Sequence, residues 1–201
     1  MATDLYTPAT FCGILENAFY FEVLLSFLVA ETDKNPLEED TFNISVDCRQ
    51  YWIRSNKNKF LLLNDDGKFT AQNLTTAQQS QSDGKFNIQI YNSCQLGETG
   101  RAVMLFVNKD GKKMVACCNK NGEIYPEAMD LPNQIEENAH KAVFYRMRLA
   151  STNKYTLESS LCPTKFLGFE CDGENQTLNK LVLRHVGKDE VDESCEFMFC
   201  P

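Results

Sequence analysis

The chain has 201 residues, of which 43% are hydrophobic and 24% charged, with 20 basic side chains against 28 acidic ones. This size and composition fit one globular domain with an appendage. The net charge of -8 excludes a nucleic-acid partner, because the chain lacks the excess of cations needed to displace counterions from phosphates.

The negative charge lies mostly in the first 40 residues. This leader holds one basic residue, Lys34, and eight acidic ones, which gives a net charge of -7. Residues 41–201 hold the other 19 basic and 20 acidic residues and are nearly neutral. We therefore expect two parts, a separate leader over 1–40 and a folded domain over 41–201.

The leader contains an apolar run from Ala18 to Ala30. No Lys or Arg precedes this run, and no small-residue cleavage site follows it before Glu31, so it does not fit a secretory signal. Thirteen residues with a central glutamate are also too few to span a bilayer. We expect a short amphipathic or buried helix here, no membrane insertion, and synthesis in the cytosol.

Nine cysteines are spread along the chain without a CxxC pair, and only two histidines, His140 and His185, accompany them. Structural zinc sites need paired ligand clusters, so we expect no metal and no other cofactor. With no export signal, the thiols are expected to be reduced during synthesis. Neither histidine is accompanied by a strand-turn nucleophile motif, so we expect no enzymatic activity.

After residue 40 the pattern has the period of two that is typical of half-buried strands. Phe86, Ile88 and Ile90 alternate with polar residues, and in 143–149 apolar residues alternate with Arg146 and Arg148. Five dipeptides suited to tight turns separate such runs: Asp66-Gly67, Asp83-Gly84, Asp110-Gly111, Asn121-Gly122 and Asp172-Gly173. We expect no helix after residue 40 and twelve strands, near 44–54, 59–64, 68–73, 86–92, 102–108, 113–119, 122–128, 143–149, 155–160, 165–171, 178–186 and 195–200.

Twelve short strands joined mostly by hairpins must bury one face and protect their edges, which a closed barrel capped by hairpins does. A β-trefoil has three units of four strands, and here those units would begin near residues 44, 102 and 155. The expected fold class is therefore all-β, a β-trefoil with three pseudo-repeats. The pattern alone fits a two-sheet sandwich almost as well.

Several segments carry a family resemblance. The sequence from Tyr155 to Phe169, YTLESSLCPTKFLGF, resembles the signature of the interleukin-1 cytokine family, with a strand ending in Glu-Ser, a short loop and an aromatic-aliphatic strand. The segments KLVLRHVGKDEVDES, CEFMF, IRSNKNKFLLLNDDGKFTAQNL and FNIQIYNSCQ are similar to other strands of one member of that family. The leader, with NAFYF at 17–21, is similar to its pro-segment, although the apolar stretch from Glu22 to Val29 departs from such pro-segments.

The resemblance implies a proinflammatory cytokine that is stored as an inactive cytoplasmic precursor, cut by an inflammatory caspase and secreted by an unconventional route. It implies a monomeric ligand that induces interferon-γ through a primary and an accessory receptor chain with immunoglobulin-like ectodomains, and a soluble binding protein as a further partner. Two alternatives stay open. One is another ligand of this family, agonist or receptor antagonist, and the other is a carbohydrate-binding trefoil module.

The resemblance places the caspase site at Asp40. Caspases recognise an extended tetrapeptide that ends in Asp, and Leu37-Glu38-Glu39-Asp40 offers one, with the small Thr41 after the scissile bond. The alternative interpretation of these residues is a solvated acidic linker.

The resemblance also indicates receptor contacts on the first strands. Arg49 and Arg54 lie on either side of Trp52 and match basic positions of the receptor-binding face; arginine beside an aromatic ring is frequent in binding hot spots. The alternative is that polar residues of a half-buried strand simply face water. Leu74 matches an apolar contact position, whereas Asn58 stands where the family has a receptor-facing acid.

Two further charged groups are candidates for receptor contact. Lys109, Lys112 and Lys113 bracket the Asp110-Gly111 turn, where they would contact the accessory chain or only keep the hairpin soluble. Asp189 belongs to an acidic loop near the C-terminus, for which a receptor contact and a solvated turn are the two interpretations.

Overall fold

The computed structural model describes residues 9–15, 18–23, 42–81, 84–93, 101–136, 139–171, 179–187 and 190–201. The chain divides into two units, Met1–Leu37 and Glu38–Pro201. In the first unit, β1 (Ala9–Leu15) and β2 (Ala18–Val23) form an antiparallel pair. The expected helix is therefore wrong over Ala18–Val23, because this aromatic-rich run has a neighbouring strand with which to share its backbone hydrogen bonds.

The second unit contains nearly all of the described strands. They are β3 (Phe42–Ser55), β4 (Phe60–Leu63), β5 (Phe69–Gln72), β6 (Phe86–Ser93), β7 (Arg101–Lys109), β8 (Lys112–Cys118), β9 (Ile124–Ala128), β10 (Gln134–Ile135), β11 (Phe144–Arg148), β12 (Lys154–Ser159), β13 (Lys165–Cys171), β14 (Asn179–His185) and β15 (Phe197–Cys200). The twelve expected strands are confirmed, and the two-residue β10 is additional.

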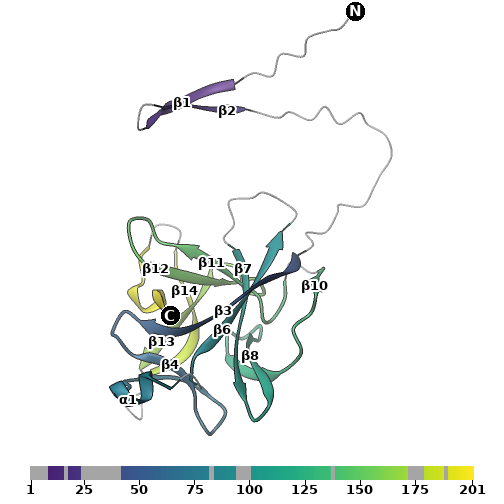
Figure 1. Ribbon diagram of the computed structural model, residues 1–201, viewed down its shortest axis with the longest axis vertical. Coiled ribbons are helices and arrows are strands. Elements are labelled where there is room, and N and C mark those ends of the chain that lie inside the picture. The colour runs from purple at the N-terminus through teal and green to yellow at the C-terminus, as the bar shows by residue number, and fades with distance from the viewer. Residues whose placement is uncertain are drawn as a thin grey trace, which may run out of the picture. The chain divides into compact units, whose positions relative to one another are not determined.

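Six of these strands close into a ring. β3 pairs with β6, β6 with β7, β7 with β11, β11 with β12, β12 with β15, and β15 returns to β3 (Figure 1). Three hairpins, β4–β5, β8–β9 and β13–β14, accompany the ring, and β14 also pairs with β5. The arrangement is a β-trefoil whose units begin at Phe42, Arg101 and Lys154, close to the expected starts.

The main core fills the barrel and the space under the hairpins. It includes Ile53, Val103, Phe144, Leu157 and Phe197, each no more than 1% exposed and each contributed by a ring strand. A second cluster lies on the other face of β7, where Met104 and Phe106 pack with Val115 of β8. Because β7 is covered on both faces, its sequence is a continuous apolar run rather than an alternating one.

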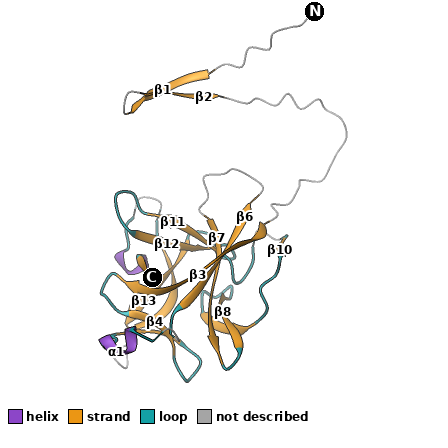
Figure 2. Cartoon of the chain, in the orientation of Figure 1, coloured by secondary structure: helices purple, strands orange, loops and turns teal. Residues whose placement is uncertain are grey.

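Two short helices interrupt the strands, so the expectation of no helix after residue 40 is wrong (Figure 2). The helix α1 (Thr76–Gln79) starts with a capping box, in which the Thr75 hydroxyl accepts from the Gln78 amide and the Gln78 side chain accepts from the Thr75 amide. The 3-10 helix η1 (Glu193–Cys195) begins after Asp192, whose carboxylate accepts from the Ser194 amide. Across the described residues, none of the helices has the length and apolar character that a membrane span requires.

Candidate functional site

The interior side chains of the barrel change from apolar to cationic at one end. On β3, Ile53 is buried, Tyr51 half-buried and Arg49 exposed, and the period of two gives all three the same face of the strand. The same change occurs from Val103 to Arg101 on β7 and from Phe144 to Arg146 on β11. We call Arg49, Arg101 and Arg146 the arginine rim; together with Asp47, Tyr51, Ile88 and Ile90 they line a cavity of about 80 Å³.

Two aromatic rings contact the guanidinium group of Arg146 in the arginine rim. The guanidinium carbon of Arg146 lies 5.3 Å from the ring centre of Tyr155 and 5.9 Å from that of Phe199. Phe199 in turn packs against Tyr155 and Tyr51, with ring centres 5.1 and 5.9 Å apart. These cation–π and ring contacts allow a half-buried guanidinium to keep its charge.

The arginine rim concentrates positive charge. Arg101 and Arg146 lie directly opposite each other in the β7–β11 pair, an arrangement that is repulsive for like charges. Burial, assisted by the nearby charges of Arg101 and Arg49, lowers the pKa of Arg146. Among the described residues, none of the ion pairs involves a rim arginine, and Asp47 is the only acid in the cavity lining. An anionic group of a partner would relieve this repulsion.

The expected combination of Arg49, Trp52 and Arg54 does not form a single surface. Arg49 and Arg54 are five residues apart on one strand and so face opposite sides. Trp52 is only 6% exposed; its ring contacts Phe60 edge-on and its Nε1 donates to the Gln79 carbonyl oxygen at 3.1 Å. The tryptophan is therefore a core residue beneath α1. Arg54 donates to the Met198 sulfur at 3.5 Å, and its Nε is buried without a hydrogen-bond partner.

Asn58 and Leu74 belong to the same β3–β4–β5 part of the fold as Arg54. Asn58 is exposed in the β3–β4 turn, where its φ of 60° lies in the left-handed region that asparagine tolerates well. Leu74 is half-buried just before α1, and its carbonyl oxygen accepts from the Gln79 side chain. The structure thus gives a second group of candidate residues on a face distinct from the arginine rim.

The three lysines of the β7–β8 hairpin differ in their surroundings. Lys109 donates to the Asn64 carbonyl oxygen at 2.8 Å and pairs with Asp65 at 3.1 Å, so it fastens the hairpin to the β4–β5 turn. Lys112 is exposed, and Lys113 lies with its ammonium 5.7 Å from the ring centre of Phe106. Lys112 and Lys113 are thus the more accessible part of the basic group.

The remaining candidates, Leu37 to Thr41 and Asp189, lie outside the described residues. Sequence reasoning missed Arg101 and Arg146. It assigned Arg146 to the solvent face of its strand because the apolar residues on either side were taken as the buried face. In the structure Val143 and Phe144 are both buried, one in each core cluster, so alternation could not identify the outer face.

In the described part of the chain, no group of three or more His, Cys, Asp or Glu could hold a metal ion.

Comparison with known proteins gives the family. No family model matches the chain. Mouse interleukin-18 is 31% identical over 179 residues, which cover 89% of this chain and 88% of the relative, and rat interleukin-18 is 30% identical over 164 residues, 82% and 80% of the two chains. The chain belongs to the interleukin-1 cytokine family, as a homologue of interleukin-18. It is therefore a cytokine, a non-enzymatic ligand with an extracellular action.

The solved structures agree with the fold. The crystal structure of chicken interleukin-1β matches with a TM-score of 0.58 at 18% sequence identity, covering 80% of this chain and 99% of the chicken chain. At this identity the likeness concerns the β-trefoil alone. Chicken interleukin-1β thus shares the fold on which this chain carries the arginine rim.

Proposed function

We propose that this interleukin-18 homologue is an inactive cytoplasmic precursor that an inflammatory caspase cuts after Asp40. Residues 1–40 then act as a pro-segment, and residues 41–201 are secreted by an unconventional route as the active, monomeric cytokine. The tetrapeptide Leu37-Glu38-Glu39-Asp40, followed by Thr41, supports this site. Cleavage there removes a net charge of -7 and leaves a nearly neutral domain.

The released domain induces interferon-γ by binding a two-chain receptor of the interleukin-18 type, with immunoglobulin-like ectodomains. The observation that carries this docking proposal is the arginine rim, in which three guanidinium groups gather at the open end of the barrel. Carboxylates of the primary receptor chain would meet these charges, and arginine is well suited to such contacts because of its fixed fork of donors. A soluble binding protein would compete for the same surface.

Other surfaces complete the proposed assembly. Arg54, Asn58 and Leu74 form a second contact with the primary chain, on the face opposite Arg49. The exposed Lys112 and Lys113, with Lys109 behind them, contact the accessory chain, and Asp189 pairs with a basic group of the receptor. In the uncut precursor, the net charge of -7 on the pro-segment weakens the attraction between the chain and an acidic receptor surface, and receptor binding is weaker than after cleavage.

The test is cleavage of the purified full chain by an inflammatory caspase, followed by N-terminal sequencing and an interferon-γ induction assay on cut and uncut chains. We expect a new terminus at Thr41 and activity confined to the cut form. Asp40→Ala should stay uncut and inactive, whereas the matched control Asp33→Ala should be cut normally. Equal activity of the cut and uncut chains would refute the precursor role, and a different terminus would refute the assignment of Asp40.

A further inference from the structure

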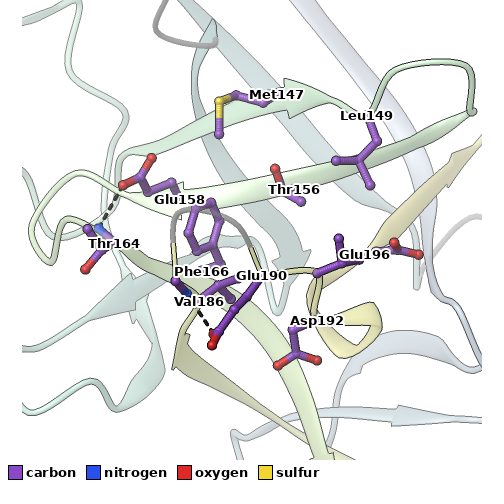
Figure 3. Close-up of a pocket in the computed structure, with 12 residues that line it drawn as sticks. Met147, Leu149, Thr156, Glu158, Thr164, Phe166, Val186, Glu190, Asp192 and Glu196 are labelled. Carbon is purple, nitrogen blue, oxygen red and sulfur yellow. Dashed lines mark hydrogen bonds between the residues drawn. The ribbon is translucent and has the colours of Figure 1, made fainter.

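A groove of about 480 Å³ lies between the β11–β12 hairpin, the strand β13 and the segment that follows β14 (Figure 3). Its floor is apolar and includes Met147, Leu149, Phe166 and Val186. This volume is within the range of pockets that hold ligands or anchoring side chains. We call it the acid-rimmed groove, because Glu158 and Glu190 also line it.

The acid-rimmed groove is separate from the arginine rim. Met147 directly follows Arg146 on β11, so the two side chains face opposite sides of that strand. Thr156 lies opposite Met147 on β12, and Phe166 of β13 lies opposite Glu158. A partner can therefore occupy the groove without contacting the arginine rim, on which the docking proposal above rests.

The groove exposes apolar side chains to solvent, which indicates that a partner binds there. The four floor residues are only half-buried, and Val191 at its margin is 81% exposed. Among the described residues, Val46 and Val191 are the large hydrophobic side chains that stand fully open to solvent. An exposed apolar side chain beside a concave apolar surface is typical of a contact site.

The carboxylates of the groove fall into two kinds. Asp192 and Glu196 are neutralised by Arg184 at 2.7 Å and by Lys154 at 2.6 Å. Glu158 instead accepts from the Thr164 amide at 2.8 Å and Glu190 from the Gly187 amide at 3.0 Å, and none of the described cations pairs with either. Within the described ranges, these two carboxylates are therefore held in place by backbone amides and have no cationic side chain paired with them.

We infer that the acid-rimmed groove binds a partner polypeptide through a lysine or arginine side chain. The methylene stem of such a side chain lies on the apolar floor of Met147 and Phe166, while its cationic head reaches Glu158 and Glu190. Charge complementarity favours this occupant over the chain's own leader, which carries a net charge of -7 and would be repelled by the same carboxylates.

The proposal is tested by NMR titration of the isotope-labelled full chain with three acetylated, amidated pentapeptides, Ala-Leu-X-Leu-Ala, in which X is arginine, norleucine or glutamate. We expect the arginine peptide to shift the backbone signals of Phe166, Gly187 and Glu190 in a saturable manner. The norleucine peptide should bind about fivefold more weakly, and the glutamate peptide should not saturate.

The matched variants are Glu158→Gln with Glu190→Gln, and the control Glu170→Gln, which removes a carboxylate paired with Lys180 outside the groove. The double variant should lose about fivefold in affinity for the arginine peptide, and the control should lose none. If the double variant has a lower melting temperature than the unmodified chain, the single variant Glu190→Gln, at an exposed position, replaces it in the titration. Equal binding of the glutamate peptide, no saturable binding of the arginine peptide, or unchanged affinity in the variants would overturn the proposal. Self-association of the chain that the double substitution abolishes would do so as well, because it would make a second copy the occupant.

Discussion

Arg146 occupies a position that is unfavourable for folding. It is half-buried, lies opposite Arg101 in the strand pair, and depends on Tyr155 and Phe199 for favourable contacts. A residue with this balance contributes little net stability, since the cation–π contacts are offset by desolvation and like-charge repulsion. Under the proposed function, the role of Arg146 is to offer a positive charge to a negatively charged partner.

This balance predicts the effect of Arg146→Gln. We expect affinity for the primary receptor chain to fall about tenfold or more, because a guanidinium at the centre of an interface is a frequent hot spot. The melting temperature should change by less than about 3 °C. Surface plasmon resonance and calorimetry measure the two effects, with the exposed Arg148→Gln as control. A large drop in melting temperature with unchanged affinity would show that Arg146 is structural.

Buried thiols give a second prediction at this scale. Burial, with smaller effects from neighbouring charges, raises the pKa of Cys117 from 9.0 to about 12. Since the thiol ionises more readily in the unfolded chain, its contribution to stability is complete below pH 9 and is lost as the pH rises from 9 to about 12.

Urea denaturation at pH 8 and pH 10.5 measures this loss. The free energy of unfolding should fall with pH in the unmodified chain, and Cys117→Ala should reduce the slope by about 1 kcal/mol per pH unit. The slope should persist in part, because burial also raises the pKa of Tyr91 to about 12. The exposed Cys171→Ala is the control. An identical slope in Cys117→Ala would contradict the prediction.

Strands and turns are the level at which this sequence is most informative. Alternating apolar residues and Gly-containing turns located all twelve expected strands, because each hairpin is decided by a few neighbouring residues. The elements that were missed depend on distant partners or are very short. β10 has two residues and exists only through its pairing with Phe42 and Asn43, and the apolar run at Ala18–Val23 became a strand because β1 lies beside it. Of the three rim arginines, only Arg49 was predicted as a site residue. Arg101 and Arg146 come close to it only because the strands that carry them close into the ring.

The β7–β8 turn gives a prediction about local conformation. Asp110 and Gly111 have φ of 52° and 73°, the values of a two-residue type I′ turn. A Cβ on Gly111 would meet no atom within 4 Å, so Gly111→Ala tests backbone strain alone. We expect a loss of about 1 kcal/mol in chemical denaturation.

Gly84→Ala is the comparison for Gly111→Ala, because it would destabilise the chain through crowding and not through backbone strain. Its Cβ would lie 2.8 Å from the Trp52 ring, and the cost there arises from overpacking, on the order of 1–3 kcal/mol. Lys112→Ala, at an exposed position of the same hairpin, should leave the free energy of unfolding unchanged. If Gly111→Ala were as stable as the unmodified chain, the type I′ geometry would be wrong.

At the scale of the whole molecule, the ring is closed by its last strand. β15 pairs with both β3 and β12, and Phe197, 1% exposed, reaches the centre of the core. Removing residues 197–201 would leave two strand edges unpaired and a cavity in the core. We expect this truncation to abolish the cooperative thermal transition followed by circular dichroism. Deletion of the exposed Pro201 alone should have no effect, and a truncated chain that still melts cooperatively would show that the ring does not need β15.

The pairing of β15 with β3 also has a consequence for biosynthesis. The strands β3 and β15, which complete the ring, are the first and last of its strands in chain order, so a nascent chain that still lacks β15 cannot close the ring. The nascent polypeptide must wait until Phe197–Cys200 emerge from the exit tunnel, and until then the incomplete barrel exposes apolar surface to which chaperones bind.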